Sequence, residues 1–365
     1  MKSKVYFTDM HVTFEENLPA KLRKLMRCAG FEDIAFANQF AAIKVHFGEP
    51  GNMSYLRPNY VKLVADYIKQ LGGKPFMTDC NTLYVGRRKN ALEHIDSAYE
   101  NGFSALTTGC HIIIGDGLKG TDDIEVPVQG SKHIEKAKIG RAVMDADIFI
   151  TLNHFKGHEA AGIGGALKNV GMGCGSRAGK MEMHNSGKPY VNAELCTACG
   201  KCPRQCAHSA IEIKNVAAIN HDKCVGCGRC IPICPFDAIE TSWDEAEQVL
   251  CEKIAEYSSA VLSGRPGFHI SFVVDVSPYC DCHAENDVPI VRNIGMFTST
   301  DPVALDVACA DAVNAQPPAE GSILARCECE GDYFTAIFPN TNWRWTTQHA
   351  ARLGLGSEEY ELIEI

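Results

Sequence analysis

The first part of the chain alternates short apolar runs with amphipathic stretches. Val5–Phe7, Ala41–Phe47 and Pro75–Asp79 are apolar runs with the length of a β-strand. Between them, apolar residues recur at helical spacing over Leu18–Cys28 and Pro58–Leu71, and the proline of the second stretch suits a first helical turn. This alternation of strands and helices predicts an α/β fold built on a largely parallel sheet.

The same alternation continues on both sides of a glycine-rich and cysteine-rich middle section. The motif Ser242-Trp243-Asp244-Glu245 has the form of a capping box, and Asp301 followed by Pro302 has the form of a helix start. The further elements that the pattern predicts are helices near Lys89–Glu100 and Ile139–Met144, a helix after residue 245 with Leu250, Ile254, Tyr257 and Val261 on its buried face, and strands at Ile112–Ile114, Asp147–Leu152 and Phe268–Val276.

The middle section carries two runs of four cysteines with the same spacing, Cys-x-x-Cys-x-x-Cys-x-x-x-Cys. In bacterial two-cluster ferredoxins such a run holds three corners of one cubic cluster, and its fourth cysteine reaches the other cluster. Zinc sites more often use paired Cys-x-x-Cys knuckles, so zinc-binding or structural cysteines are the alternative interpretation. The spacing predicts one [4Fe–4S] cluster on Cys196, Cys199, Cys202 and Cys234 and a second on Cys224, Cys227, Cys230 and Cys206.

The chain has 365 residues, which a usual domain size of about 100–200 residues divides into two or three domains. We expect an α/β domain over 1–186 with a Gly-rich loop that carries histidines and lysines, an inserted two-cluster ferredoxin module of α+β type over 187–241, and a C-terminal α/β part over 242–365 that packs on the first domain. The module repeats itself, because each cysteine run is followed by Ala-Ile-Glu, at 210–212 and at 238–240.

Charge and apolar content limit the partners and the compartment. The formal net charge of −10 argues against binding nucleic acid through a broad basic surface. The first residues show no apolar segment of a secretory signal, and no stretch approaches the length needed to span a membrane. With 18 cysteines, eight of them assigned to clusters, a reducing cytoplasm is the expected location.

A glycine-rich stretch, 153–173, follows directly from a predicted strand. The carboxyl ends of parallel strands are where α/β proteins bind ligands, and glycines let the backbone approach a ligand closely. Two histidines and two lysines here, among them His158 and Lys168, would form a cradle for an anion or a nucleotide. The alternative is a loop of solvated polar residues. Lys44, inside another predicted strand, either is buried beside an anionic partner or reaches the surface with its ammonium group.

Two further motifs follow predicted strands. Asp79-Cys80-Asn81-Thr82 is expected to point into the same crevice. The motif Cys280-Asp281-Cys282-His283 places two thiols beside an acid and an imidazole, and Cys174 of the glycine-rich stretch could join them. These residues would hold a third metal or cluster, or else the cysteines are small buried apolar side chains.

Four features together resemble the bacterial and archaeal family called domain of unknown function 362, in its ferredoxin-fused form. They are the two cysteine runs, the stretch from His158 to Gly173, the stretch Tyr279–Cys282 and the stretch Asp301–Asp306. The resemblance extends over essentially the whole chain. It implies the two clusters and the architecture described above, and it leaves the substrate open.

A more distant similarity connects His158, Lys168 and His184 with the nickel-pincer lactate racemases. In those enzymes the matching residues are an acid/base histidine, a lysine that carries the pincer nucleotide and a histidine that ligates nickel. The corresponding expectation for this chain is an extra metal site formed by Cys280, Cys282 and His184. Where the racemases have a Gly-Thr-His-Arg stretch, this chain has Asn81-Thr82.

The sequence as a whole predicts an iron–sulfur oxidoreductase. Electrons from a redox partner protein, a ferredoxin or a reductase, would enter one cluster, pass to the second and reach an unknown small anionic substrate in the α/β crevice. There His158, Lys168 and Lys44 would bind or protonate the substrate. Two alternatives stay open: an electron carrier or docking protein without a substrate of its own, and a metal-dependent isomerase.

Overall fold

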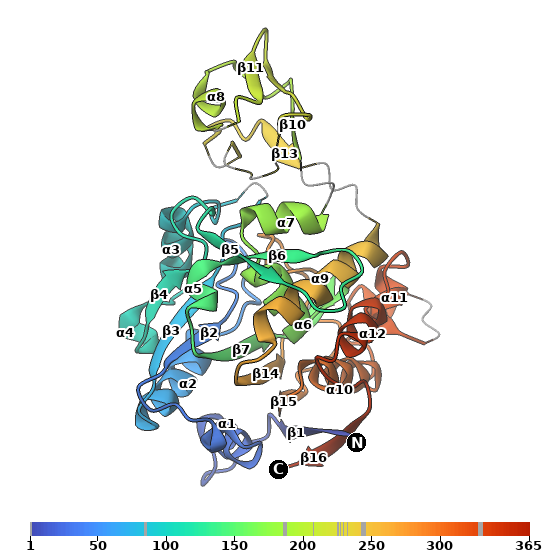
Figure 1. Ribbon diagram of the computed structural model, residues 1–365. Helices are drawn as coiled ribbons and strands as arrows, with labels where there is room; N and C mark the ends of the chain where they lie inside the picture. The colour runs from blue at the N-terminus through green and yellow to red at the C-terminus, as the bar shows by residue number, and fades with distance from the viewer. Residues whose placement is uncertain are drawn as a thin grey trace.

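The structure of the protein, a computed structural model, centres on one large mixed sheet (Figure 1). Eight strands form it, in the order β16-β1-β15-β14-β7-β2-β3-β4. Their bounds are β1 Ser3–Asp9, β2 Phe40–Lys44, β3 Lys74–Asp79, β4 His111–Ile114, β7 Ile148–His154, β14 Gly267–Val273, β15 Gly295–Ser299 and β16 Tyr360–Glu364. The structure describes residues 2–83, 86–184, 188–206, 208–224, 226, 228, 230–231, 233–241, 246–327 and 331–365.

Seven strands of this sheet run in one direction, and β15 alone runs against them. The α/β class with a largely parallel sheet is therefore confirmed. Strands from the two ends of the chain share the sheet, because β1 pairs with both β15 and β16. The helices are α1 Leu18–Cys28, α2 Pro58–Gln70, α3 Ala91–Glu100, α4 Ala105–Thr108, α5 Arg141–Met144, α6 Ala166–Cys174, α7 Arg177–His184, α8 Lys201–Gln205, α9 Glu247–Leu262, α10 Pro302–Asn314, α11 Tyr333–Ile337 and α12 Arg344–Arg352.

Alternate side chains of the central strands point into two different apolar cores, as the pleat of a strand requires. Ile43 of β2 and Ile150 of β7 lie in a core with α1 and α2. Their neighbours Ala42 and Phe149 lie in a second core with α6 and α9. A third core joins Phe297 of β15 to α10. Among the described residues, helices thus cover both faces of the sheet.

Helix starts agree closely with the sequence where a capping residue marks them. Asn17 accepts a hydrogen bond from the backbone of α1, and Asp301 accepts two from the first turn of α10. Three predicted elements are corrected. The strand expected at 268–276 ends at Val273. The strand expected at 41–47 ends at Lys44. The helix expected at 139–144 is shortened to α5, because Ile139 is buried in strand β6 (Lys136–Gly140), which pairs antiparallel with β5 (Asp123–Pro127). The capping box at 242–245 lies outside the described residues.

The glycine-rich stretch is not a loop. It forms a short hairpin, β8 (Lys156–His158) and β9 (Gly162–Gly164), and then helix α6. Gly171 lies in α6 where the helix crosses α9, and a Cβ added there would stand 2.2 Å from the carbonyl oxygen of Ile254. The expectation that these glycines admit a ligand is therefore corrected at Gly171, which instead lets two helices approach each other.

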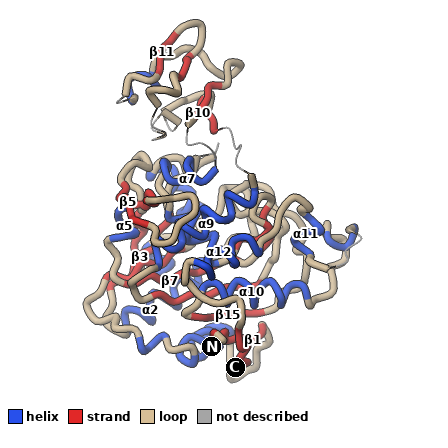
Figure 2. The backbone as a smooth tube through the Cα atoms, turned by 45° about the vertical axis from the view of Figure 1, so that its right-hand side comes forward, coloured by secondary structure: helices blue, strands red, loops and turns tan. Residues whose placement is uncertain are grey.

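The described residues between 188 and 241 form a small separate lobe, which we call the cysteine-rich lobe; the rest is the body (Figure 1). In it β10 (Pro189–Val191) pairs with β13 (Ile239–Thr241), and β11 (Ile211–Ile213) pairs with β12 (Ala217–Ile219). Figure 2 shows both chain termini at the end of the body away from this lobe. The domain boundaries at 186/187 and 241/242 stay predictions.

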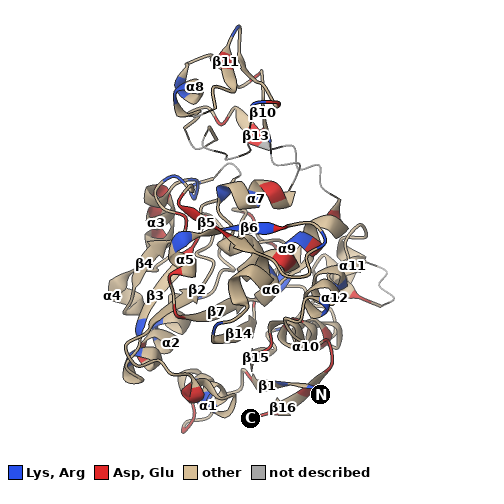
Figure 3. Ribbon diagram, viewed as in Figure 1, with Lys and Arg blue, Asp and Glu red and all other residues tan. Residues whose placement is uncertain are grey.

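Acidic and basic residues are interspersed over the body and the cysteine-rich lobe in the view of Figure 3. Within the described ranges, every helix falls short of the length and apolar character that crossing a bilayer requires.

Candidate functional site

Four cysteines of the cysteine-rich lobe line one cavity. They are the first quartet expected from the sequence, Cys196, Cys199, Cys202 and Cys234. The backbone N–H of Ala217 donates to Cys196 Sγ, and that of Ala238 donates to Cys234 Sγ, both at 3.3 Å. Hydrogen bonds to the ligand sulfur atoms are one of the features that tune an iron–sulfur cluster when it is bound. The geometry therefore fits a [4Fe–4S] cluster, although the ligand set itself stays a prediction.

The lobe repeats its backbone geometry between the two cysteine runs. Gly200 and Gly228 take the same left-handed conformation, with φ of 71° and 65°. Ser209 and Asp237 do so as well, with φ of 48° and 51°, although side chains disfavour this region. The duplicated sequence pattern thus corresponds to a duplicated backbone.

Three members of the second expected quartet are described, and Cys227 lies outside the described residues. Cys206 Sγ accepts a hydrogen bond from the N–H of Ala210 at 3.3 Å, which is the counterpart of the bond at Cys234. Cys230 is buried in the apolar core of the lobe. The repeat extends the argument from the first quartet to the second, which also stays a prediction.

Among the described residues, the cysteine-rich lobe contacts the body mainly through the loop after β3 and helix α7, and Lys119 Nζ adds a hydrogen bond to Gln205 Oε1 at 3.1 Å. Leu83, from the loop after β3, and Met181, from α7, belong to the same apolar cluster as Cys230. Lys89, further along the loop after β3, forms an ion pair with Asp237 of the lobe. The loop after β3 and helix α7 therefore form the seat of the lobe.

The carboxyl ends of β2, β3 and β7 meet at a cavity in the body, which we call the first cavity. Lys44, Asp79 and His154, the last residues of these strands, line it. Lys44 is fully buried, so burial beside an anion is the arrangement found: its Nζ lies 3.1 Å from Asp79 Oδ1 and donates to Asn169 Oδ1 at 2.6 Å. Burial tends to raise the pKa of Asp79, but the charge of Lys44 outweighs it and lowers that pKa.

Cations outnumber anions around the first cavity. Arg88 is balanced by Glu49, at 2.7 Å between Nε and Oε2. Lys156, Lys168 and Lys180 line the cavity too, and none of them pairs with a carboxylate in the part of the chain that the structure describes. Lys180 instead donates to backbone carbonyls. The first cavity is therefore suited to an anionic ligand.

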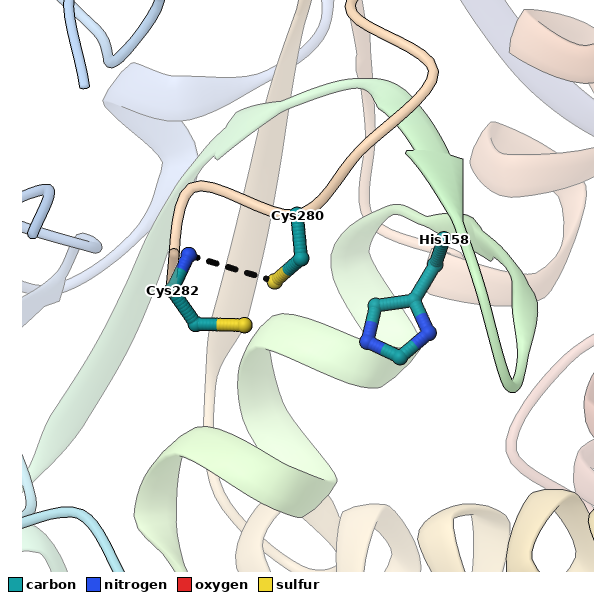
Figure 4. A group of neighbouring side chains, drawn as sticks. All are labelled: His158, Cys280 and Cys282. Carbon is teal, nitrogen blue, oxygen red and sulfur yellow. Dashed lines mark hydrogen bonds between the residues drawn. The ribbon is translucent and has the colours of Figure 1, made fainter. Parts of the chain in front are cut away.

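Cys280 and Cys282 lie beside His158, with a nitrogen of the imidazole and both Sγ atoms within 4.8 Å of one another (Figure 4). All three side chains are buried. Lys168 Nζ lies 3.1 Å from Cys280 Sγ, and Lys156 Nζ lies 3.9 Å from it. The structure thus joins the Cys-x-Cys motif to the hairpin and helix of the glycine-rich stretch.

The two thiols of this group have opposite shifts. Burial would raise the pKa of Cys280, but a hydrogen bond with Cys282 and the charges of Lys156 and Lys168 outweigh it and hold that pKa well below its usual value. The same hydrogen bond, together with burial, raises the pKa of Cys282 well above its usual value. The pKa values of the two thiols are therefore shifted in opposite directions, downward at Cys280 and upward at Cys282.

A second cavity, of about 360 Å³, adjoins the first. His158, Lys168 and His184 line it together, and Cys282 lines both cavities. Burial lowers the pKa of His184 to about 3, which keeps its imidazole neutral. The three residues singled out by the distant racemase similarity thus meet at one place. In the described part of the chain His158 groups with both thiols, His283 groups with Cys282 and Glu159, and Cys174 lies in the second core instead.

Sequence reasoning included Lys156 only as one of the two lysines of the glycine-rich stretch, and it gave Asp306 no role in the site. Lys156 stands two residues before His158 on β8, so the strand period alone places both on one face. Asp306 stands in the apolar helix α10, and such an isolated acid is itself a signal. It accepts hydrogen bonds from the N–H groups of Ala166 and Leu167, at 2.6 and 2.9 Å, and so holds the start of α6, which carries Lys168. Burial raises the pKa of Asp306 to about 7.

Two solved structures are similar to this chain at low identity. One is the lactate racemase apoprotein from Thermoanaerobacterium thermosaccharolyticum, with 10% identity, a TM-score of 0.35, and coverage of 68% of this chain and 45% of that one. The other is a protein from Thermotoga maritima solved by a structural genomics consortium, with 12% identity, a TM-score of 0.42, and coverage of 83% of this chain and 60% of that one. This chain therefore spans less than two thirds of either structure.

Comparison with protein families gives a firmer result. No curated protein matches the chain. The model of one family, described as "Domain of unknown function (DUF362)", matches residues 41–311. That range contains the first cavity, the glycine-rich stretch, the cysteine-rich lobe and the Cys-x-Cys motif. Since it makes up most of the chain, the protein belongs to the domain of unknown function 362 family.

Proposed function

We propose that this protein is an iron–sulfur oxidoreductase, with two [4Fe–4S] clusters in the cysteine-rich lobe and a small anionic substrate in the cavities of the body. The observation that supports it most is the seat of the lobe. Two of the segments that contact the lobe, the loop after β3 and helix α7, also line the cavities.

The cysteines of the lobe fit two such clusters. One quartet lines a single cavity with backbone N–H donors at its sulfur atoms, and the second repeats its geometry. When bound, clusters of this kind supply one-electron carriers of low potential. The ligands would be Cys196, Cys199, Cys202 and Cys234 for one cluster and Cys224, Cys227, Cys230 and Cys206 for the other.

Helix α7 contacts the lobe and both cavities. Met181 packs into the apolar cluster around Cys230. Lys180 lines the first cavity, and His184 lines the second. One short helix therefore contacts both the lobe that would hold the clusters and the cavities that would hold the substrate.

The loop after β3 makes the same connection. Leu83 packs into the lobe, and Lys89 pairs with Asp237. Between them in the chain, Arg88 lines the first cavity and donates from Nη2 to the carbonyl oxygen of Cys282 at 3.2 Å. These contacts support the proposal that electrons pass between the lobe and the first cavity.

Within the cavities each polar group has a distinct role in this proposal. Lys168 binds the anionic group of the substrate. Lys44 is already paired with Asp79, so it holds the wall of the first cavity in place. His158 accepts two backbone N–H bonds at Nδ1, from Ala160 and Ala161, so the proton of the neutral ring is on Nε2, from which it can be donated into the cavity. A ferredoxin or reductase would deliver electrons, in a reducing cytoplasm.

The test is metal and sulfide analysis of protein purified without oxygen, with low-temperature EPR of the reduced form. We expect about eight iron and eight sulfide per chain. The variant Cys202→Ser should lose one cluster signal, whereas the matched control Cys28→Ser, exposed on α1, should lose none. Zinc in place of iron, or no metal at the lobe, would refute the proposal.

Two other functions have specific tests. A metal-dependent isomerase is favoured by one observation, the meeting of His158, Lys168 and His184 at the second cavity. Nickel in the purified protein, with an adduct on Lys168 in its mass spectrum, would support it, and the extra metal site at Cys280, Cys282 and His184 would then be its place. A plain electron carrier would bind no anion in the body.

A further inference from the structure

The Cys-x-Cys motif has a chemistry that the proposed clusters do not explain. Cys280 and Cys282 lie in the loop after β14, and the N–H of Cys282 donates to Cys280 Sγ at 3.4 Å. Both thiols are buried beside His158, and the three ligand atoms come within 4.8 Å of one another (Figure 4). Such a group is either a metal site or a reactive pair of thiols, and the surrounding charges distinguish the two.

Two lysines lie beside the sulfur atom of Cys280. Lys168 Nζ, at 3.1 Å, and Lys156 Nζ, at 3.9 Å, both face Cys280 Sγ. Lys156 is only 5% exposed, so water screens its charge poorly. Two ammonium groups already balance the negative charge of a thiolate there. They would repel a divalent cation placed between the sulfur atoms.

The imidazole of His158 is also arranged as a donor. Its Nδ1 accepts the N–H groups of Ala160 and Ala161, at 3.1 and 3.0 Å. A histidine that ligates a metal through one nitrogen normally donates a proton from the other. Here the nitrogen that faces away from the cysteines is the acceptor. The proton of the neutral ring therefore lies on the nitrogen toward the sulfur atoms, where it can donate a hydrogen bond but cannot ligate.

Only one of the two sulfur atoms is placed to meet a substrate. Cys282 lines both cavities and is 8% exposed, whereas Cys280 is 0% exposed. Lys156, Lys168 and Lys180 surround the same space without a carboxylate partner in the described ranges. These lysines therefore attract a molecule to Cys282 when that molecule carries negative charge.

We infer that Cys280 and Cys282 form a redox-active dithiol that reduces a small anionic disulfide bound beside Lys156 and Lys168. Cys282 passes its proton to Cys280 and attacks one sulfur of the substrate. This forms a mixed disulfide and releases half of the substrate as a thiolate, which takes the proton from Cys280. The Cys280 thiolate then attacks Cys282 Sγ, forms the Cys280–Cys282 disulfide and releases the second half as a thiolate.

Regeneration of the dithiol rests on the proposed function. The Cys280–Cys282 disulfide takes up two electrons and one proton from water in the cavity, and the two [4Fe–4S] clusters, when bound, would supply one electron each. The disulfide returns to a thiolate at Cys280 and a thiol at Cys282. Arg88, which donates to the carbonyl oxygen of Cys282, and Lys89, which pairs with Asp237, connect the motif with the cysteine-rich lobe along the chain.

The experiment uses the full chain, purified without oxygen, reduced with a small thiol and desalted. It is mixed with 3,3′-dithiodipropionate, a small anionic disulfide, or with cystamine, a cationic disulfide of similar size. Peptide mass spectrometry then follows the Cys280–Cys282 segment. With the anionic probe we expect this peptide to lose two hydrogen atoms, at a rate at least tenfold above that with cystamine.

Variants separate the steps. Cys280→Ser should stop at a mixed disulfide between Cys282 and half of the probe, because the resolving thiol is gone. Cys282→Ser should form no disulfide, and the matched control Cys28→Ser should behave like the unmodified protein. The inference is overturned if the peptide keeps both thiols free, if cystamine reacts as fast, or if purified protein carries zinc or iron that Cys280→Ser removes.

A second arm distinguishes this inference from the proposed function. Protein that carries the disulfide is treated with dithionite to reduce its clusters. Return of the two thiols in the unmodified protein, with slower return in Cys202→Ser, supports both. If the probe produces the Cys280–Cys282 disulfide but reduced clusters do not reduce it, the proposed electron transfer is refuted and the dithiol inference still holds. If the clusters are reduced but Cys280 and Cys282 never form a disulfide with the probe, the dithiol inference is refuted and the proposed iron–sulfur function is not.

Discussion

The buried ion pair at the first cavity allows a sharp test of how the body is held together. Lys44 Nζ and Asp79 Oδ1 are 3.1 Å apart, with side chains 0% and 4% exposed. Replacing Lys44 by Met removes the charge, keeps the side-chain length, and leaves Asp79 buried without its main partner. Removing one member of a buried pair costs about 3–5 kcal/mol of unfolding free energy. We expect a loss of this size for both Lys44→Met and Asp79→Asn.

The double variant decides whether the pair itself is responsible. If each single variant loses stability because it leaves one buried charge without a partner, the double variant Lys44→Met with Asp79→Asn leaves no such charge. The combined loss should then fall short of the sum of the single losses by about 2–3 kcal/mol. Lys44 also donates to Asn169 Oδ1 at 2.6 Å, so part of the single loss will remain in the double variant.

The assay is equilibrium unfolding in urea without oxygen, followed by tryptophan fluorescence and extrapolated linearly to water. The three tryptophans of the chain supply the signal. Exposed ion pairs contribute less than about 1 kcal/mol. Single losses that small, or losses that add up fully in the double variant, would refute the argument that a desolvated charge pair holds β2 to β3.

Three further outcomes follow from single contacts. Gly171→Ala should lower stability by about 1–3 kcal/mol in urea unfolding, because its Cβ would stand 2.2 Å from the carbonyl oxygen of Ile254; the control Gly267→Ala, with its nearest contacts at 3.5 Å, should change little. Asp306→Ala should cost about 1–3 kcal/mol by leaving two N–H groups at the start of α6 without an acceptor. Glu256 is buried, which raises its pKa, but its hydrogen bonds outweigh this and lower the pKa. Its contribution is therefore present above the unfolded pKa of about 4.3 and is lost as pH falls. Melting curves of Glu256→Gln should accordingly depend less on acid pH.

The elements themselves could be predicted from local sequence. Helix α1 matches its expected bounds of 18–28, because the capping residue Asn17 stands directly before an amphipathic stripe. The strand order could not be predicted in this way. It joins β1 near the N-terminus to β15 and β16 near the C-terminus, and no local pattern encodes a pairing between residues so far apart.

The site also has features that could be predicted from local sequence and features that could not. Cysteine spacing placed four cysteines around one cavity, because short separations along the chain limit where thiols can point. The role of Gly171 was misjudged, since only the packing of α6 on α9 shows what its missing side chain makes room for. Lys44 was left between two alternatives, and the buried position of Asp79 decided between them.

Sequence by itself determined the α/β class, the helix caps, the duplicated cysteine pattern and the strand ends where ligands would bind. These depend on the period of the backbone and on residues only a few positions apart. Tertiary structure alone decided that Cys280 meets Lys168 and His158, more than 100 residues earlier in the chain, and that the cysteine-rich lobe rests on the walls of the cavities. Those contacts arise only when distant segments pack against one another, because burial and charge are properties of the folded chain.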